Sequence, residues 1–274
     1  MRTTVKEYYE KLESAVGALL ESGGVKEFFS NMAKFRRYSF ANQLLIMLQR
    51  PGATRVAGMT TWNGVQRRVK KGERGIAVFA PIFRKKGSGD SEEEALVGFK
   101  TVHVFDISQT EGKDLSCKEL QGTTDFVASP DVDTGELTRR LRSACPVPVL
   151  RKPLAGMRGY YDPANGVIVL SESLSDRGIP RTLIHEMAHW LAIRTGEHRA
   201  DAASGERPMG EVVAEAAAFI ALSHFGLDTG SISFAYVAGW GRDVKKIVSW
   251  GSAAMRVANG LIDLVEGREQ NKAA

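Results

Sequence analysis

Helical spacing of apolar residues predicts the principal helices of this chain. Leu183, Met187, Trp190 and Leu191 recur on one helical face after a chain break at 178–180, and Pro180 suits the first turn of a helix. Two further runs show the same behaviour: an alanine-rich run over 210–221 and a shorter run through 44–48. We therefore expect three helices in these regions.

Short apolar runs bounded by turn residues predict strands in two other places. Residues 76–83 and 98–105 form one expected pair, and the polar, glycine-containing stretch 84–94 is expected to be the loop between them. Tyr160–Tyr161 and 167–170 flank an Asp-Pro-Ala-Asn-Gly turn, which predicts a β-hairpin. The hairpin stands directly before the helix that begins near Pro180, so both belong to one local unit.

Charge divides the chain into two parts. The net charge is +5 over 274 residues, and residues 126–274 hold 17 basic and 17 acidic side chains. The whole excess therefore lies in the first 125 residues, where 26–86 carry fourteen Lys or Arg against two Glu. A basic module that meets a polyanion, followed by a neutral module, is the simplest interpretation. We predict domains at 1–125 and 126–274, with the boundary near 122–124.

The neutral part contains the chain's most specific chemical motif, His185-Glu186-Met187-Ala188-His189. Positions i and i+4 of a helix share a face, so His185 and His189 can bind one ion while Glu186 reaches its water. Two imidazoles with a carboxylate suit zinc, and a site that keeps water is catalytic. The motif predicts a Zn²⁺ centre with Glu186 as its proton-transfer residue.

The third zinc ligand has to come from another segment. Ala192 and Thr195 stand where a metzincin would have glycine and histidine, which excludes that class. Glu215 is the preferred ligand, because it lies deeper in the apolar run where a carboxylate needs a cationic partner. Glu211, one turn earlier, is the alternative, and His198 is a weaker one.

Basic side chains of the first part alternate with rings and amides, a pattern typical of single-strand binding. Cations follow the phosphate backbone and rings stack on unpaired bases, whereas duplex readers usually present a recognition helix. The candidate DNA-binding residues are Lys34, Arg36, Arg37, Tyr38, Asn42, Gln43, Trp62, Arg67, Arg68, Lys70, Lys71 and Arg74. The alternative for the aromatic members, and for Phe40, is a place in the hydrophobic core.

Three segments of the basic part carry a family resemblance: 38–43, the block from Trp62 to Ile76, and 104–110. They resemble the N-terminal single-stranded-DNA-binding domain of ArdC-type antirestriction proteins. The resemblance implies a following zincin-type metallopeptidase domain, which is also similar to ImmA/IrrE peptidases. In those peptidases a glutamate of an E-A-x-x-F-A-like block ligates the metal, and Glu215-Ala216-Ala217-Ala218-Phe219 matches it.

The expected fold class is α+β. An N-terminal α+β single-stranded-DNA-binding domain is followed by a mostly helical zincin-like metallopeptidase domain with a small β-sheet. The expected function is a DNA-binding antirestriction protein with a metallopeptidase-like domain, and the partners are single-stranded DNA and a possible protein substrate. The alternative is a regulatory zinc endopeptidase that cuts a repressor or host protein, with DNA as locator or trigger.

Compartment and redox state follow from what the sequence lacks. The N-terminus has no apolar signal-peptide core, and no apolar run is long enough to span a membrane. Cys117 and Cys145 have no paired spacing and are expected to be ordinary thiols. We therefore expect a cytoplasmic protein with no membrane partner.

Overall fold

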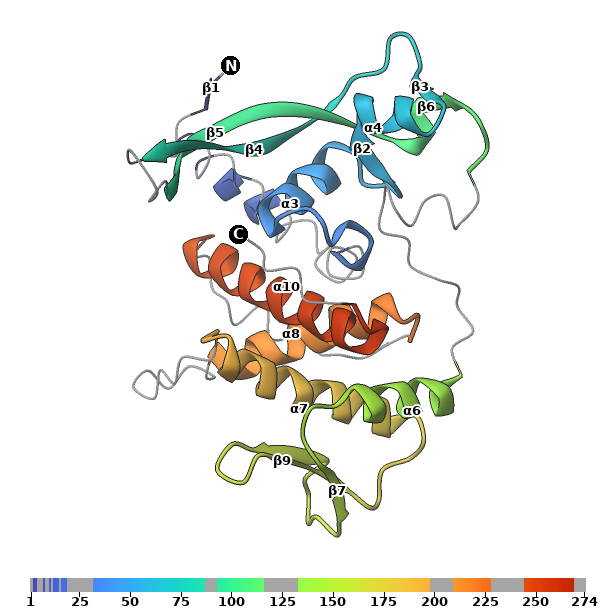
Figure 1. Cartoon of the computed structure of the whole chain (residues 1–274), viewed down its shortest axis with the longest axis vertical. Helices are drawn as coiled ribbons and strands as arrows, with labels where there is room; N and C mark the ends of the chain where they lie inside the picture. Colours follow the sequence, from blue (N-terminus) through green and yellow to red (C-terminus); the bar gives the residue numbers. More distant parts are fainter. Residues whose placement is uncertain are drawn as a thin grey trace. The chain divides into compact units, whose positions relative to one another are not determined.

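The structure is a computed structural model that describes residues 2–3, 7, 10, 12–14, 16–18, 32–86, 93–115, 133–197, 209–227 and 244–268. The chain divides into two compact units (Figure 1). The first unit comprises Met1–Phe28 and Arg37–Phe126, and the second comprises Phe29–Arg36 and Val127–Ala274. The mixed composition of helices and small sheets confirms the predicted α+β class.

A twisted antiparallel ribbon of two long strands forms the centre of the first unit (Figure 1). Strand β4 (Ile76–Lys86) pairs along its length with β5 (Glu93–Asp106), with a bulge between Ile82 and Phe83. On its other side β5 pairs with β1 (Arg2–Thr3) and β2 (Val56–Gly58). The predicted strand pair is confirmed, but both strands continue into 84–94, which the sequence assigned to a loop.

The other edge of β4 is covered by side chains of helix α3 (Phe40–Gln49), whose first turn is capped by Ser39. The Asn42 amide donates to Phe79 O (2.8 Å) and accepts from Phe79 N (2.9 Å). Gln49 makes the same two bonds to Ala77, both at 2.9 Å. Pro81, two residues further along β4, has no N–H to offer. The side-chain amides of Asn42 and Gln49 thus make the hydrogen bonds that a neighbouring strand would make.

A smaller cluster closes the far end of this unit. Helix α4 (Met59–Gly64) is followed by β3 (Arg67–Val69), which pairs antiparallel with β6 (Thr110–Gly112) after the short helix η2 (Ile107–Gln109). Trp62 packs in a core with Ala57 and Phe105, and its Nε1 donates to Phe105 O (2.9 Å). This core joins α4 to the central sheet.

In the second unit, a small sheet in the order β7-β9-β8 packs against one helix. The predicted hairpin is confirmed as β8 (Gly159–Asp162) and β9 (Val167–Ser171), and Asp162 accepts from the turn amides of Ala164 and Asn165. Strand β7 (Val149–Lys152), which follows helix α6 (Thr134–Ala144), adds parallel to β9 and was not predicted.

Three long helices complete the second unit (Figure 1). They are α7 (Gly178–Arg194), α8 (Met209–His224) and α10 (Val244–Glu266), and each contacts the other two. Alanines buried on α7 and α8 allow their axes to come close. On α10, a β-carbon at Gly260 would lie 2.7 Å from Leu191 Cδ2, so a larger residue there would force the Leu191 side chain to shift. The predicted helices at 181–191 and 210–221 are thereby confirmed.

A short N-terminal segment also belongs to the second unit. Helix η1 (Ala33–Phe35) packs on α8, and the following Arg36 forms an ion pair with Asp263 of α10. The carboxylate of Glu266 lies between two side chains: its Oε2 is 3.7 Å from Arg36 Nη1, and its Oε1 is 2.9 Å from His224 Nε2. The predicted boundary at residue 125 places 33–36 in the first domain, whereas these contacts hold them in the second unit.

Candidate metal centre and nucleic-acid interface

Helix α7 brings the two motif histidines together on one face. His185 and His189 are one turn apart, and their Nε2 atoms lie 3.1 Å from each other. Both side chains are largely shielded from solvent. Two imidazole nitrogens aimed at one point are the arrangement that a shared metal ion needs.

Glu211, in the first turn of α8, brings a carboxylate beside the two histidines. Its carboxylate lies 3.4 Å from His189 Nε2 and 3.8 Å from His185 Nε2, and the three ligand atoms fall within 4.8 Å of one another. Ligand atoms bound tetrahedrally at roughly 2.0–2.2 Å would be separated by about 3.3–3.6 Å. The donor set therefore fits one tetrahedral ion with a fourth position left open.

Glu215 contacts the His185 ring at its other nitrogen, Nδ1. Its Oε2 lies 3.0 Å from His185 Nδ1. A carboxylate at Nδ1 favours the tautomer with its proton there, which leaves the Nε2 lone pair available. The sequence favoured Glu215 as ligand and held Glu211 as the alternative; in the structure Glu211 faces both Nε2 atoms. His198 lies outside the described residues.

Glu186, the residue between the two histidines of the motif, is buried, with 6% exposure. Burial raises the pKa of this carboxyl to about 7, and the charge of Glu211 acts in the same direction. The opposing contributions come from His185 and from the backbone N–H of Tyr161 on β8, which donates to the carboxylate. A carboxyl with a pKa near neutrality can both accept and return a proton.

Five of the predicted DNA-binding residues prove to hold the fold instead. Trp62 is fully buried in the core described above, so its ring is not available for a base. Asn42 secures the β4 edge, and Gln43, also fully buried, donates to Tyr38 O. Arg67 is buried against Thr110 and Lys113 O. These four side chains are thus buried and engaged within the unit, an outcome of tertiary packing that the sequence does not show.

Arg36 is the fifth of these residues. Its guanidinium is 9% exposed and is held by Asp263 and Glu266 of the second unit, so it serves an internal ion-pair cluster. Lys34, in η1, belongs to that unit as well. Arg37 is exposed, while Tyr38 is half-buried and its hydroxyl donates to Val56 O (3.0 Å).

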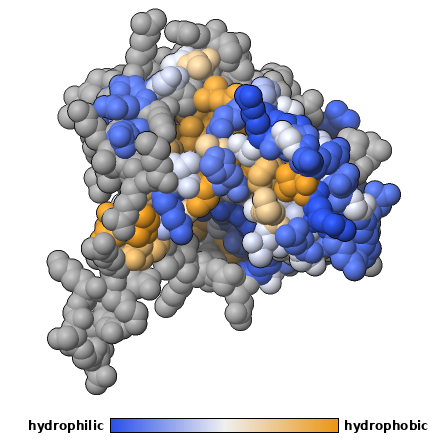
Figure 2. Space-filling model, turned by 90° about the horizontal axis from the view of Figure 1, so that it is seen from above, coloured by the Kyte–Doolittle hydropathy of each residue, from blue (hydrophilic) through white to orange (hydrophobic). Residues whose placement is uncertain are grey.

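The remaining predicted residues lie close together in the sequence, with Arg68 in strand β3 and the other three in the turn that follows it. Arg68, Lys70, Lys71 and Arg74 are all exposed, and they surround the turn at Gly72, where φ is +90°. We call residues 68–75 the basic loop. Figure 2 shows hydrophilic residues gathered over the end of the first unit that carries β3 and β6. Four exposed cations within eight residues make this segment the strongest candidate for contact with a polyanion.

Gln109, a buried residue that is not among the predicted site residues, holds the basic loop through hydrogen bonds. The Gln109 amide donates to Glu73 Oε2 (2.9 Å) and to Arg74 O (2.8 Å), and its oxygen accepts from Asp106 N. Lys70 N donates to Gln109 O (2.9 Å). The sequence signal was present in Asp106-Ile107-Ser108-Gln109, which forms a capping box around η2.

Comparison with known proteins finds one matching family model and two similar solved structures. A family model described as the N-terminal domain of anti-restriction factor ArdC matches residues 5–105. Two crystal structures of the antirestriction ArdC protein from plasmid R388, one metal-free and one with Mn(II) bound, are similar to this chain. Each has a TM-score of 0.63 at 19% identity and covers 96% of this chain, and the alignments include 99% and 98% of those chains.

A curated relative extends the comparison to a sequence of greater length. An uncharacterized protein of Bacillus anthracis is 24% identical over 325 aligned positions, covering 98% of this chain and 53% of the relative. The chain thus spans about half the length of that protein. Among the described residues, none of the helices combines the length and apolarity needed to cross a membrane. Residues 5–105 match the family model of ArdC N-terminal domains, and the fold of the chain is similar to that of the two ArdC structures.

Proposed function

We propose that this protein binds single-stranded DNA through its first unit and holds a catalytic metal ion in its second. The basic loop carries the first half of the proposal. Its exposed cations are Arg68, Lys70, Lys71 and Arg74, and the Gln109 contacts hold the backbone beneath them in one conformation. A loop ordered in advance loses little conformational entropy when it binds a phosphate chain.

The arrangement of three donors carries the second half. His185, His189 and Glu211 would hold the ion, and Glu215 would orient the His185 ring from its other nitrogen. Two imidazoles and a carboxylate suit Zn²⁺, and the ArdC protein from R388 has been crystallised with Mn(II). When bound, such an ion supplies Lewis-acid polarisation of a water or a substrate carbonyl.

The protein's own residues would perform the proton transfers. Glu186 is kept in place by the Tyr161 amide, and the pKa of its carboxyl, raised by burial to about 7, suits it to receive a proton and pass it to a leaving amine. Strand β8, which supplies that amide, ends the described sheet on the side away from β9. An extended peptide laid along β8 would place its backbone beside Glu186.

A second candidate function is a regulatory metallopeptidase for which DNA is a locator or trigger. The observation in its favour is Glu186: a buried carboxyl with a pKa near 7 costs stability, and a purely structural metal site has no need of it. The two candidates use the same residues. They differ in whether cleavage or DNA coating protects the incoming DNA.

Charge reversal in the basic loop tests the DNA-binding half. Changing Arg68, Lys71 and Arg74 to glutamate should weaken binding to an oligo-dT strand by at least about tenfold. The slope of log K against log salt should fall by about 2, since each lost single-strand phosphate contact contributes about 0.7. Fluorescence anisotropy across a salt series measures both quantities.

The matched control reverses three exposed cations of the second unit, Arg142, Lys152 and Lys245, and so changes the net charge equally. Its affinity for the strand should stay close to that of the wild type. The Debye length at physiological salt is about 8 Å, so only charges near the bound strand contribute. Equal losses in both triple variants would show that net charge, and no particular loop, attracts the DNA.

A further inference from the structure

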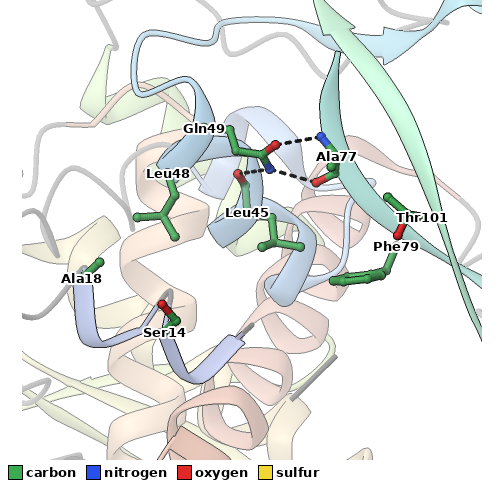
Figure 3. Close-up of a pocket in the computed structure, with 8 residues that line it drawn as sticks. All are labelled: Ser14, Ala18, Leu45, Leu48, Gln49, Ala77, Phe79 and Thr101. Atoms are coloured by element: carbon green, nitrogen blue, oxygen red, sulfur yellow. Dashed lines mark hydrogen bonds between the residues drawn. The ribbon is translucent and has the colours of Figure 1, made fainter. Parts of the chain in front are cut away.

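The first unit contains a cavity of about 370 Å³ that neither half of the proposed function uses. Figure 3 shows Leu45 and Leu48 of α3 extending toward it, with Ser14 and Ala18 opposite and with Phe79 and Thr101 on the sheet side. All of these residues belong to the first unit. Leu48 keeps 40% of its surface exposed, so the cavity has an apolar rim open to solvent.

The chemistry of the wall favours a flat, largely apolar ligand. Most of the lining is aliphatic or aromatic, and the Gln49 amide is already engaged: it donates to Leu45 O and Ala77 O and accepts from Ala77 N, each at 2.9 Å (Figure 3). The hydroxyls of Ser14 and Thr101 are the other side-chain polar groups of the described lining. Such a wall recognises shape and apolar surface and offers little to discriminate hydrogen-bonding patterns.

The position of the cavity connects it with the basic loop. The loop ends at Gly75, and Ala77, which lines the cavity, follows two residues later on β4. At about 3.3 Å for each residue of a strand, the loop and the cavity are about 7 Å apart along the backbone. A single strand whose phosphates follow Arg74 would therefore carry its next bases to the cavity mouth.

Single-strand binding also requires surfaces on which bases can stack. Trp62 and Phe40, two aromatic side chains that the sequence offered for this purpose, are buried elsewhere in the core. Among the described residues that line the cavity, Leu45, Leu48 and the largely buried Phe79 supply apolar surface bordering an open volume. The exposed Leu48 in particular can contact a base, which the buried Trp62 and Phe40 cannot.

We propose that this cavity receives one nucleobase of the single strand held by the basic loop, between Leu48 and the wall formed by Phe79. The inference rests on the proposed DNA binding and adds a base-binding subsite to it. The volume lies at the small end of ligand pockets, as one base requires. Because Gln49 is occupied by backbone groups, the subsite accepts any base that fits and gives no strong sequence preference.

The test compares the full-length wild type with two cavity variants. Leu48→Ser removes the apolar rim, and Ser14→Phe fills the cavity from the opposite wall. Each should bind an oligo-dT strand about tenfold more weakly than the wild type, whereas all three proteins should bind an abasic strand of equal length alike. A single 2-aminopurine placed along the oligo-dT should change its fluorescence on binding to the wild type and much less with Ser14→Phe.

Met59→Ser is the matched control, since Met59 is an exposed apolar side chain of the same unit that does not line the cavity. It should bind both strands as the wild type does, and thermal denaturation checks that every variant is folded. If folded Leu48→Ser and Ser14→Phe both keep wild-type affinity while loop charge reversal abolishes binding, the base subsite is refuted and the proposed function stands. If the wild type binds no single strand at all, the proposed function fails and the subsite fails with it.

Discussion

At the level of single residues, two glutamates one turn apart on α8 carry different contacts. Glu211 faces both histidine Nε2 atoms and is 48% exposed, whereas Glu215 reaches His185 Nδ1 and is 26% exposed. Helical spacing puts both on the side of α7, so the sequence alone could not distinguish a ligand from the residue that orients a ligand. The distinction depends on which ring nitrogen each carboxylate meets.

Alanine substitution separates these two roles. Glu211→Ala should leave the protein with little or no bound metal after dialysis, since one of three donors is gone. Glu215→Ala should retain the site but weaken its affinity by about 10–100-fold, the usual cost of losing a partner of a ligating histidine. Elemental analysis and competition with a chelating dye measure the two effects.

Glu172→Ala, at an exposed position of the same unit, is the control and should bind metal like the wild type. The opposite ranking, with metal lost from Glu215→Ala and kept in Glu211→Ala, would exchange the two roles. It would restore the ligand that the motif at 215–219 suggested.

At the level of elements, Asp106 joins β5 to the loop before β2 and to η2. Its carboxylate accepts from the amides of Thr54 (2.7 Å) and Arg55 (2.8 Å) and from Ser108. Burial raises the pKa of Asp106, but the hydrogen bonds from Ser108, Arg55 and Thr54 outweigh it, so the pKa lies below its usual value of 3.8. The charged form is therefore the one that stabilises the fold.

The sign of the pH effect follows from this lowered pKa. The stabilising contribution should be complete above about pH 5 and be lost as the pH falls below 3.8 through the folded-state value. Asp106→Asn should lower the free energy of unfolding by about 1.5–3 kcal/mol at pH 7 and flatten its acid dependence. Urea unfolding at pH 7, 5 and 3 measures both effects. If the unfolding free energy of Asp106→Asn falls between pH 5 and 3 as steeply as that of the wild type, this role is contradicted.

Elements with their own local signal were predictable, and those that depend on distant partners were not. The apolar spacing located α7, whose first turn contains Pro180 and begins at Gly178, within the predicted break; the turn at 162–166 located the β8–β9 hairpin. Strand β7 was not predicted, because it pairs parallel with β9 and β8 lies between the two strands in the sequence. For the same reason Trp62 and Arg67 were taken for binding residues: their hydrogen-bond partners lie 43 residues away.

At the level of the whole molecule, the proposed activities use separate units and should be separable by mutation. Glu186→Gln keeps the shape of the side chain but removes its basicity, so peptide cleavage should fall by about 10²–10⁴-fold. Bound metal and affinity for single strands should not change, because Glu186 lies in the second unit and is not a ligand in the proposed site. Metal analysis, anisotropy and a peptide-library assay provide the three readouts.

A restriction-protection assay in cells then ranks the two candidate functions. Protection that survives Glu186→Gln but not the loop charge reversal identifies DNA coating as the source of antirestriction. Protection lost with Glu186→Gln, at unchanged metal content and DNA affinity, assigns it to proteolysis.

The side-chain amides that line the edge of β4 have a consequence for crowded assemblies. Proteins that coat single-stranded DNA are held close to one another. A sheet edge with unpaired N–H and C=O groups would let each copy extend its neighbour's sheet and start a fibril. Here Asn42 and Gln49 occupy the backbone groups of Phe79 and Ala77, and Pro81 offers no donor at the next such position. If the proposed DNA coating brings copies close together, the backbone groups of Phe79 and Ala77 are already bonded within each copy and would not pair with a neighbour's strand.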